Sequence, residues 1–142
     1  MLKTIVVALD ASELSERVIQ TLHELQLQPT TKILLAHVIS PPESNLEIVA
    51  DRPHADTEVV SYRHIEKQLQ SYQANLPGES ELEIVTGDPA EEIIRLANIY
   101  HADLIIIGSR GLTGVKRILQ GSVSSQVVED ASCSVLVVKP DS

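Results

Sequence analysis

Five short runs of apolar residues, separated by segments with a helical pattern, constrain the fold of this 142-residue chain more than any other feature. The runs cover residues 4–9, 33–38, 82–85, 103–107 and 134–138. Continuous β-branched runs of this kind are typical of strands buried on both faces. Because they alternate with helices, we predict an α/β fold with an open parallel five-stranded sheet and helices on both faces. The length favours a single domain over residues 1–142.

The segments between the runs predict four helices and one long surface loop. Apolar residues at helical spacing indicate a helix over residues 14–25, and an amphipathic pattern indicates another over 56–76. Asp88 is a predicted N-cap, with Pro89 at the first helical position and Glu91 completing a capping box. A last helix is predicted over 123–130, and the prolines around residues 40–54 predict a surface loop.

The composition excludes several classes of function. The net charge of −9 makes the chain a poor partner for nucleic acids and anionic membranes. Three tyrosines, with no Phe or Trp, leave few rings on which bases could stack. No apolar run approaches the ~18 residues of a membrane-spanning helix. A single cysteine, Cys133, allows no intrachain disulfide, and we therefore expect a cytoplasmic protein.

A glycine-rich segment between the fourth apolar run and the last helix predicts an anion site. It reads Gly108-Ser109-Arg110-Gly111, then nine residues, then Gly121-Ser122. Glycines let backbone N–H groups approach a phosphate, and a helix N-terminus adds its positive dipole end. The spacing matches neither the P-loop nor the dinucleotide fingerprint. The alternative is an ordinary glycine-rich connection with serine caps.

Asp10, at the end of the first predicted strand, is the second candidate in this region. Ligands of doubly wound sheets bind outside the carboxyl ends of the strands, at the topological switch point. In the strand order 3-2-1-4-5 that we predict, Asp10 and the glycine segment meet there. A carboxylate at that place can hold Mg²⁺ or Mn²⁺ against phosphates. The alternative is a turn residue or a helix N-cap.

These motifs resemble the universal stress protein family over nearly the whole chain. The pattern G-x-x-G-x9-G-[S/T] carries the resemblance, together with the opening Ile5–Ser12, the turn Gly87–Ala90 and the closing Ser134–Pro140. The family has an ATP-binding branch that carries the motif and a branch that lacks it, and this chain resembles the first. It departs from the family at Ala11, where a glycine is frequent. The implied fold is Rossmann-like, of the adenine nucleotide alpha hydrolase type.

The resemblance implies a site for ATP with Mg²⁺ or Mn²⁺. Asp10 would lie near the phosphates and hold the cation through water, while Val38 and Ile107 would flank the adenine. The full set of expected nucleotide-binding residues is Ala8, Asp10, Val38, Ile107, Gly108, Arg110, Gly111, Gly121, Ser122, Val123 and Ser124. The resemblance also implies a homodimer formed through the last strand, residues 134–138.

Three functions follow as hypotheses. The first is an ATP-binding regulator or sensor in a stress response, with a regulatory protein as a further partner. The second is a structural or partner-binding module that does not use nucleotide. The third is an enzyme, and here we expect at most slow ATP hydrolysis, because the sequence offers no clear catalytic base. We expect Cys133 and His37 to be structural, and no pair of histidines has the spacing of a zinc site.

Overall fold

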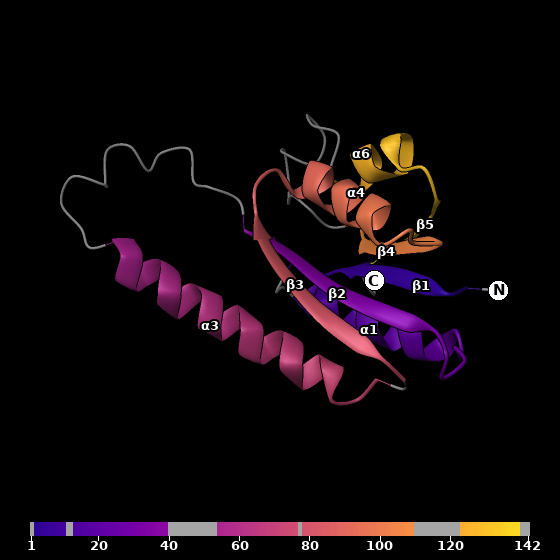
Figure 1. The fold of residues 1–142 in the computed structure, drawn as a ribbon, viewed down its shortest axis with the longest axis horizontal. Coiled ribbons are helices and arrows are strands. Elements are labelled where there is room, and N and C mark those ends of the chain that lie inside the picture. The colour runs from indigo at the N-terminus through magenta and orange to yellow at the C-terminus, as the bar shows by residue number, and fades with distance from the viewer. Residues whose placement is uncertain (1, 11–12, 40–53, 77, 110–122, 140–142) are drawn as a thin grey trace.

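The computed structural model describes residues 2–10, 13–39, 54–76, 78–109 and 123–139. Its described strands form one parallel sheet in the order β3-β2-β1-β4-β5, which confirms the predicted fold and strand order (Figure 1). The strands are β1 (Thr4–Ala8), β2 (Lys32–Ile39), β3 (Ser80–Thr86), β4 (Leu104–Gly108) and β5 (Ser134–Val138).

Among the described residues, two helices cover each face of the sheet (Figure 1). One face carries α1 (Glu13–Glu24) and α3 (His54–Gln73), and the other carries α4 (Pro89–Ile99) and α6 (Val123–Asp130). The bounds of α6 are those predicted, whereas α3 begins at His54, a residue that we expected in the surface loop, and ends at Gln73 instead of residue 76. The rest of that expected loop, residues 40–53, lies outside the described residues.

The central strand β1 is buried on both faces, as its continuous apolar run predicts. Ile5 and Val7 belong to the hydrophobic cluster under α1 and α3. Val6 and Ala8 belong to the cluster under α4 and α6. We call these the α1/α3 cluster and the α4/α6 cluster. Both are aliphatic, because the chain has no Phe or Trp to fill them.

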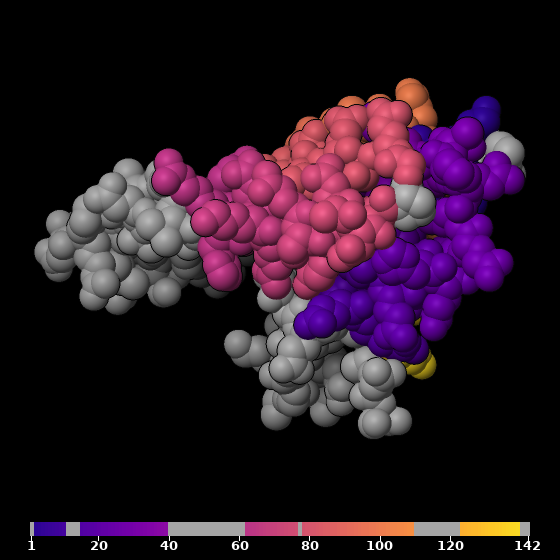
Figure 2. Space-filling view, turned by 90° about the horizontal axis from the view of Figure 1, so that it is seen from below, coloured from indigo at the N-terminus to yellow at the C-terminus, as the bar shows by residue number. Residues whose placement is uncertain are grey.

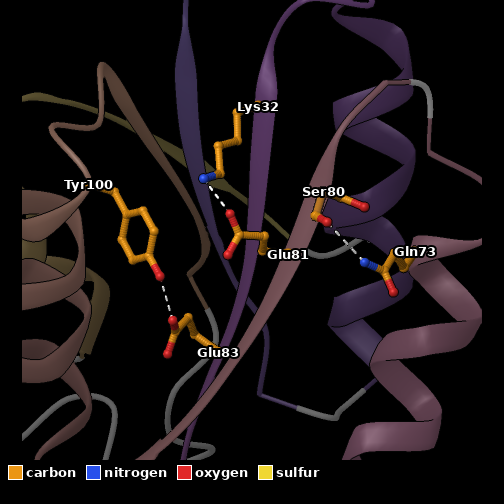
Figure 3. Close-up of polar contacts among 6 residues, drawn as sticks. All are labelled: Lys32, Gln73, Ser80, Glu81, Glu83 and Tyr100. Carbon is orange, nitrogen blue, oxygen red and sulfur yellow. Dashed lines mark hydrogen bonds and ion pairs between the residues drawn. The ribbon is translucent and has the colours of Figure 1, made fainter.

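The edge strand β3 is polar where it faces α4 (Figure 3). Lys32 of β2 forms an ion pair with Glu81, and its ammonium group lies 5.2 Å from the ring centre of Tyr100. The Tyr100 hydroxyl donates a hydrogen bond of 2.5 Å to Glu83, and this bond raises the pKa of Tyr100 to about 12. Charged residues on an edge strand discourage pairing with another sheet.

The amino end of β1 is fixed by a side-chain cap. The Asp103 carboxylate accepts from the main-chain N–H groups of Lys3 at 2.8 Å and Thr4 at 3.0 Å. These bonds lower the pKa of Asp103.

The predicted N-cap of α4 is confirmed, because Asp88 accepts from the N–H of Glu91 at 3.0 Å.

The amino-terminal part of α3 extends past the edge of the sheet (Figure 1), and seen from below α3 leads away from the body of the domain (Figure 2). At its other end Gln73 donates to the carbonyl of Ser80, which ties α3 to the start of β3 (Figure 3). No helix among the described residues is long and apolar enough to cross a membrane.

Candidate functional site

The topological switch point of the sheet lies at the carboxyl end of β1. The chain passes from β1 through α1 to β2 on one side, while β4 lies on the other side and leads on to β5. Ala8, the last residue of β1, is in register with Ala36 of β2 and with Ile107 of β4. The ends of β1 and β4 therefore lie side by side, whereas β2 continues to Ile39. Open α/β sheets bind their ligands at this edge.

The main chain of β1 leaves the sheet just after Leu9. Leu9 donates its N–H to the carbonyl of Ala36 at 2.8 Å, and its own carbonyl lies 2.7 Å from Nδ1 of His37. The next residue, Asp10, is exposed, and its Oδ1 accepts from the Ser15 hydroxyl at 3.3 Å. The strand thus ends at Ala8, one residue earlier than the apolar run predicts, and Asp10 projects beyond the sheet.

The end of β4 lies beside the end of β1. Gly108 is the last residue of β4 and is in register with Val138 of β5. The N–H of Ser109 donates to the carbonyl of Val138 at 2.8 Å, so the β4 end is held to β5 at the point where the glycine segment begins. Four predicted residues of that segment lie outside the described residues: Arg110, Gly111, Gly121 and Ser122.

Apolar residues from four elements gather below these strand ends. Ala8 and Ile107 are buried members of the α4/α6 cluster, and Val38 and Val123 are partly buried against it. Val123 is the first residue of α6 and packs against this cluster. The structure therefore brings together four predicted residues, from β1, β2, β4 and α6, on the face covered by α4 and α6.

The start of α6 offers main-chain groups more than hydroxyls. Ser124, the second residue of the helix, is only 6% exposed, whereas Ser125 is exposed. Ser124 is among the expected nucleotide-binding residues, but its side chain is buried, and the neighbouring Ser125 is the one that presents its side chain to solvent. The first N–H groups of a helix have no partner within the helix, and they are suited to an anion.

This arrangement combines apolar side chains with an exposed carboxylate. The α4/α6 cluster offers apolar surface for a base, and Asp10 offers carboxylate oxygens, which Mg²⁺ and Mn²⁺ prefer. Among the described residues, no three His, Cys, Asp or Glu side chains gather as a metal site. A cation at Asp10 would take its other ligands from water and from the phosphates of the nucleotide.

Two side chains near Asp10 were not identified from the sequence as part of this site. His37 was interpreted as a satisfied core residue; it is half-buried, and its ring nitrogen is hydrogen-bonded to the Leu9 carbonyl. Ser15 gave no signal beyond its place five residues after Asp10, in the first turn of α1.

Cys133 is partly buried, and burial raises the pKa of its thiol, in agreement with a structural role.

Comparison with known proteins identifies relatives over nearly the whole chain. The model of the universal stress protein family matches residues 1–139. A universal stress protein of Synechocystis is 30% identical over 149 residues, which cover 95% of this chain and 96% of the relative.

Two solved structures share the fold at similar coverage. The structure of protein MJ0577, from Methanocaldococcus jannaschii, has a TM-score of 0.84 and 28% identity, covering 99% of this chain and 98% of that chain. A universal stress protein solved in complex with cAMP has a TM-score of 0.70 and 25% identity, covering 97% of each chain.

Proposed function

We propose that this chain, which belongs to the universal stress protein family, binds ATP with a divalent cation and acts as a nucleotide-dependent regulator. The observation that carries the proposal is the pairing of Ala8 with Ile107 at the ends of β1 and β4, which Asp10 and Gly108 follow, beside the α4/α6 cluster. The similar protein solved with cAMP supports an adenine nucleotide as the ligand.

Each part of the site has a distinct proposed role. The adenine lies against the partly buried Val38, next to the buried Ile107. Gly108 lets the main chain approach the ribose and phosphates, and the N–H groups at the start of α6 face the phosphate oxygens. Asp10 holds Mg²⁺ or Mn²⁺ through water. From the sequence pattern, we assign Arg110, Gly111, Gly121 and Ser122 to the same ligand.

The proposed role is binding and release instead of rapid turnover. Phosphoryl transfer to water is accelerated by a group that positions the attacking water, together with the cation. We propose that Asp10 binds the cation and does not position the attacking water. We therefore expect phosphate release well below ~1 per second, under the usual range of dedicated enzymes. A sustained faster rate that depends on Mg²⁺ would favour an enzyme.

We also propose that the regulator is a homodimer formed through β5, which is an edge strand of the described sheet. The Val138 carbonyl accepts from β4, and main-chain groups of successive strand residues point to opposite sides. The N–H and C=O groups of Val135 and Val137 therefore point away from the sheet. Antiparallel pairing of two copies would satisfy these groups in a symmetric interface.

The two edges of the sheet differ in charge, and the difference favours β5. The other edge, β3, carries Glu81 and Glu83, whereas Ser134–Val138 contains no charged residue. Two copies that paired through β3 would bring these glutamates together, in a chain with a net charge of −9. Pairing through β5 brings together only a serine and aliphatic side chains.

Calorimetric titration with ATP in excess Mg²⁺ tests the nucleotide site. Two aspartates at opposite ends of the sheet provide matched variants, because Asp10 follows β1 and Asp103 caps its start. We expect Asp10→Asn to weaken binding roughly 10-fold, equivalent to about 1.4 kcal/mol. Asp103→Asn keeps an acceptor oxygen and should leave the affinity unchanged. Wild-type protein that gives no heat at ATP concentrations of about 1 mM and above would refute the proposal.

A further inference from the structure

We infer that His37 and Ser15 are positioning residues for Asp10. His37 fixes the peptide that precedes Asp10, and Ser15 fixes its carboxylate. The inference rests on the proposed function, because it assigns these residues to the binding of the cation and the phosphates. It starts from the end of β1, where two side chains from different elements hold consecutive residues.

The His37 side chain occupies the position that a main-chain N–H donor would have if the hydrogen-bond ladder between β1 and β2 were longer. Leu9 donates to Ala36, so the continuing pattern of a parallel pair would give the Leu9 carbonyl a bond from the N–H of Val38. The structure instead shows Nδ1 of His37 2.7 Å from that carbonyl. Because the imidazole replaces the ladder partner, the chain can leave the sheet after Leu9 while its last carbonyl stays anchored.

The hydrogen bond also defines the ring of His37. A carbonyl oxygen can only accept, and Nδ1 must therefore carry a proton. The Leu9 carbonyl and the N–H of Asp10 lie in one rigid peptide plane, so the anchored carbonyl sets the direction in which Asp10 departs. Loss of the Nδ1 donor would release that plane and leave the carbonyl of the buried residue Leu9 without this bond.

The position of His37 separates this role from contact with the base. Side chains alternate along a strand, and both Ala36 and Val38 belong to the α4/α6 cluster. His37 therefore projects to the opposite face, where Leu9 is part of the α1/α3 cluster. A change at His37 acts on Asp10 from the face opposite to the proposed adenine surface.

Ser15 supplies the second constraint, on the side chain of Asp10. Its hydroxyl donates to Oδ1 at 3.3 Å, and the residue is only 1% exposed, so the donor is held in the packed start of α1. With one oxygen oriented by Ser15, the carboxylate of the exposed Asp10 is restrained before any cation arrives. Outer groups that orient a metal-binding side chain commonly change metal affinity about 10–100-fold.

The test measures the dissociation constant of ATP in EDTA and in Mg²⁺. The constant in EDTA divided by the constant in Mg²⁺ gives the cation's contribution to binding. His37→Leu removes the donor and should lower this ratio about 10-fold, at the low end for outer groups. His37→Asn places an amide N–H near the position of Nδ1 and should restore most of it. Ser15→Ala, which fits the same buried space, should lower the ratio by a smaller factor.

Adenosine, which lacks phosphates, is the control ligand, and its affinity should stay the same in all three variants. Combined with Asp10→Asn, His37→Leu should cause no further loss, because both changes act through one carboxylate. The nitrogen spectrum of the wild-type imidazole in the absence of nucleotide should show a protonated Nδ1, a readout that requires no variant to fold.

The outcomes separate this inference from the proposed function. If wild-type protein binds ATP with a clear Mg²⁺ contribution and His37→Leu keeps that contribution, positioning by His37 is refuted while the nucleotide site stands. An equal loss of adenosine affinity, or an unprotonated Nδ1, also refutes it. If wild-type protein does not bind Mg²⁺-ATP, both the inference and the proposed function fail.

Discussion

At the scale of single residues, the local backbone decides which substitutions the chain tolerates. Gly78, between α3 and β3, has a φ of +73°, and a Cβ built on it would lie 2.3 Å from the Pro29 carbonyl oxygen. Both the dihedral angle and the close approach require glycine. His101, after α4, has a φ of +53° and bears the cost of that conformation as a non-glycine residue.

We predict that Gly78→Ala lowers the free energy of unfolding by about 1–3 kcal/mol, because it adds both strain and a clash with the main chain. His101→Gly should raise it by up to about 1 kcal/mol, since glycine relieves the left-handed conformation. Urea unfolding followed by circular dichroism measures both. A neutral Gly78→Ala would show that the turn relaxes more readily than its contact with Pro29 indicates.

The Tyr100–Glu83 hydrogen bond predicts a titration near pH 12. The bond favours the protonated phenol, so the pKa of the folded state lies above the usual value of 10.0, at about 12. Its contribution to stability is complete below pH 10 and is lost as the pH rises toward 12. Because the chain has no Trp, the ultraviolet difference between wild-type protein and Tyr100→Phe isolates this phenol. A midpoint close to 10 would contradict the bond.

At the scale of elements, the sequence predicted well those element bounds that depend on hydrophobic periodicity and on helix capping. The bounds of β5 and α6 and the Asp88 cap follow from local patterns alone. β1 ends one residue earlier than predicted, where the His37 side chain replaces a ladder partner. β4 is shifted by one residue, to Leu104–Gly108, and follows Asp103, whose side chain caps the start of β1. Such long-range bonds leave no periodic signal, which is why the position of His37 beside Asp10 could not be predicted.

The β5 edge gives a prediction about assembly. Val137→Pro removes an N–H that points away from β4, so the sheet should survive while the proposed pairing of two copies is lost. On β3 the N–H of Gly87 faces β2, and that of Thr86 therefore points outward, so Thr86→Pro is the matched control at the other edge. Analytical ultracentrifugation should find a monomer for Val137→Pro and a dimer for wild type and Thr86→Pro. A dimer that survives Val137→Pro would place the interface elsewhere.

At the scale of the whole molecule, topology assembles the proposed site from residues that local sequence describes only in pieces. Ala8, Val38, Ile107 and Val123 are separated along the chain, but the order β3-β2-β1-β4-β5 brings them into one cluster. The net charge of −9 opposes a free triphosphate, so the proposed ligand is the cation complex. The resemblance to the universal stress protein family predicted these four residues, whereas the arrangement of the glycine segment after Ser109 stays a prediction.

The most direct test of the account is a nuclear magnetic resonance titration of the wild-type protein with Mg²⁺-ATP, in which every backbone amide is followed. We predict that the amides at the carboxyl ends of the strands and at the start of α6 shift: Leu9, Asp10, Val38, Gly108, Ser109, Val123 and Ser124. The amides of Lys3 and Thr4, bound by Asp103 at the opposite end of the sheet, should stay in place. An unchanged spectrum at millimolar ATP, or shifts confined to another surface, would contradict a nucleotide site at the switch point.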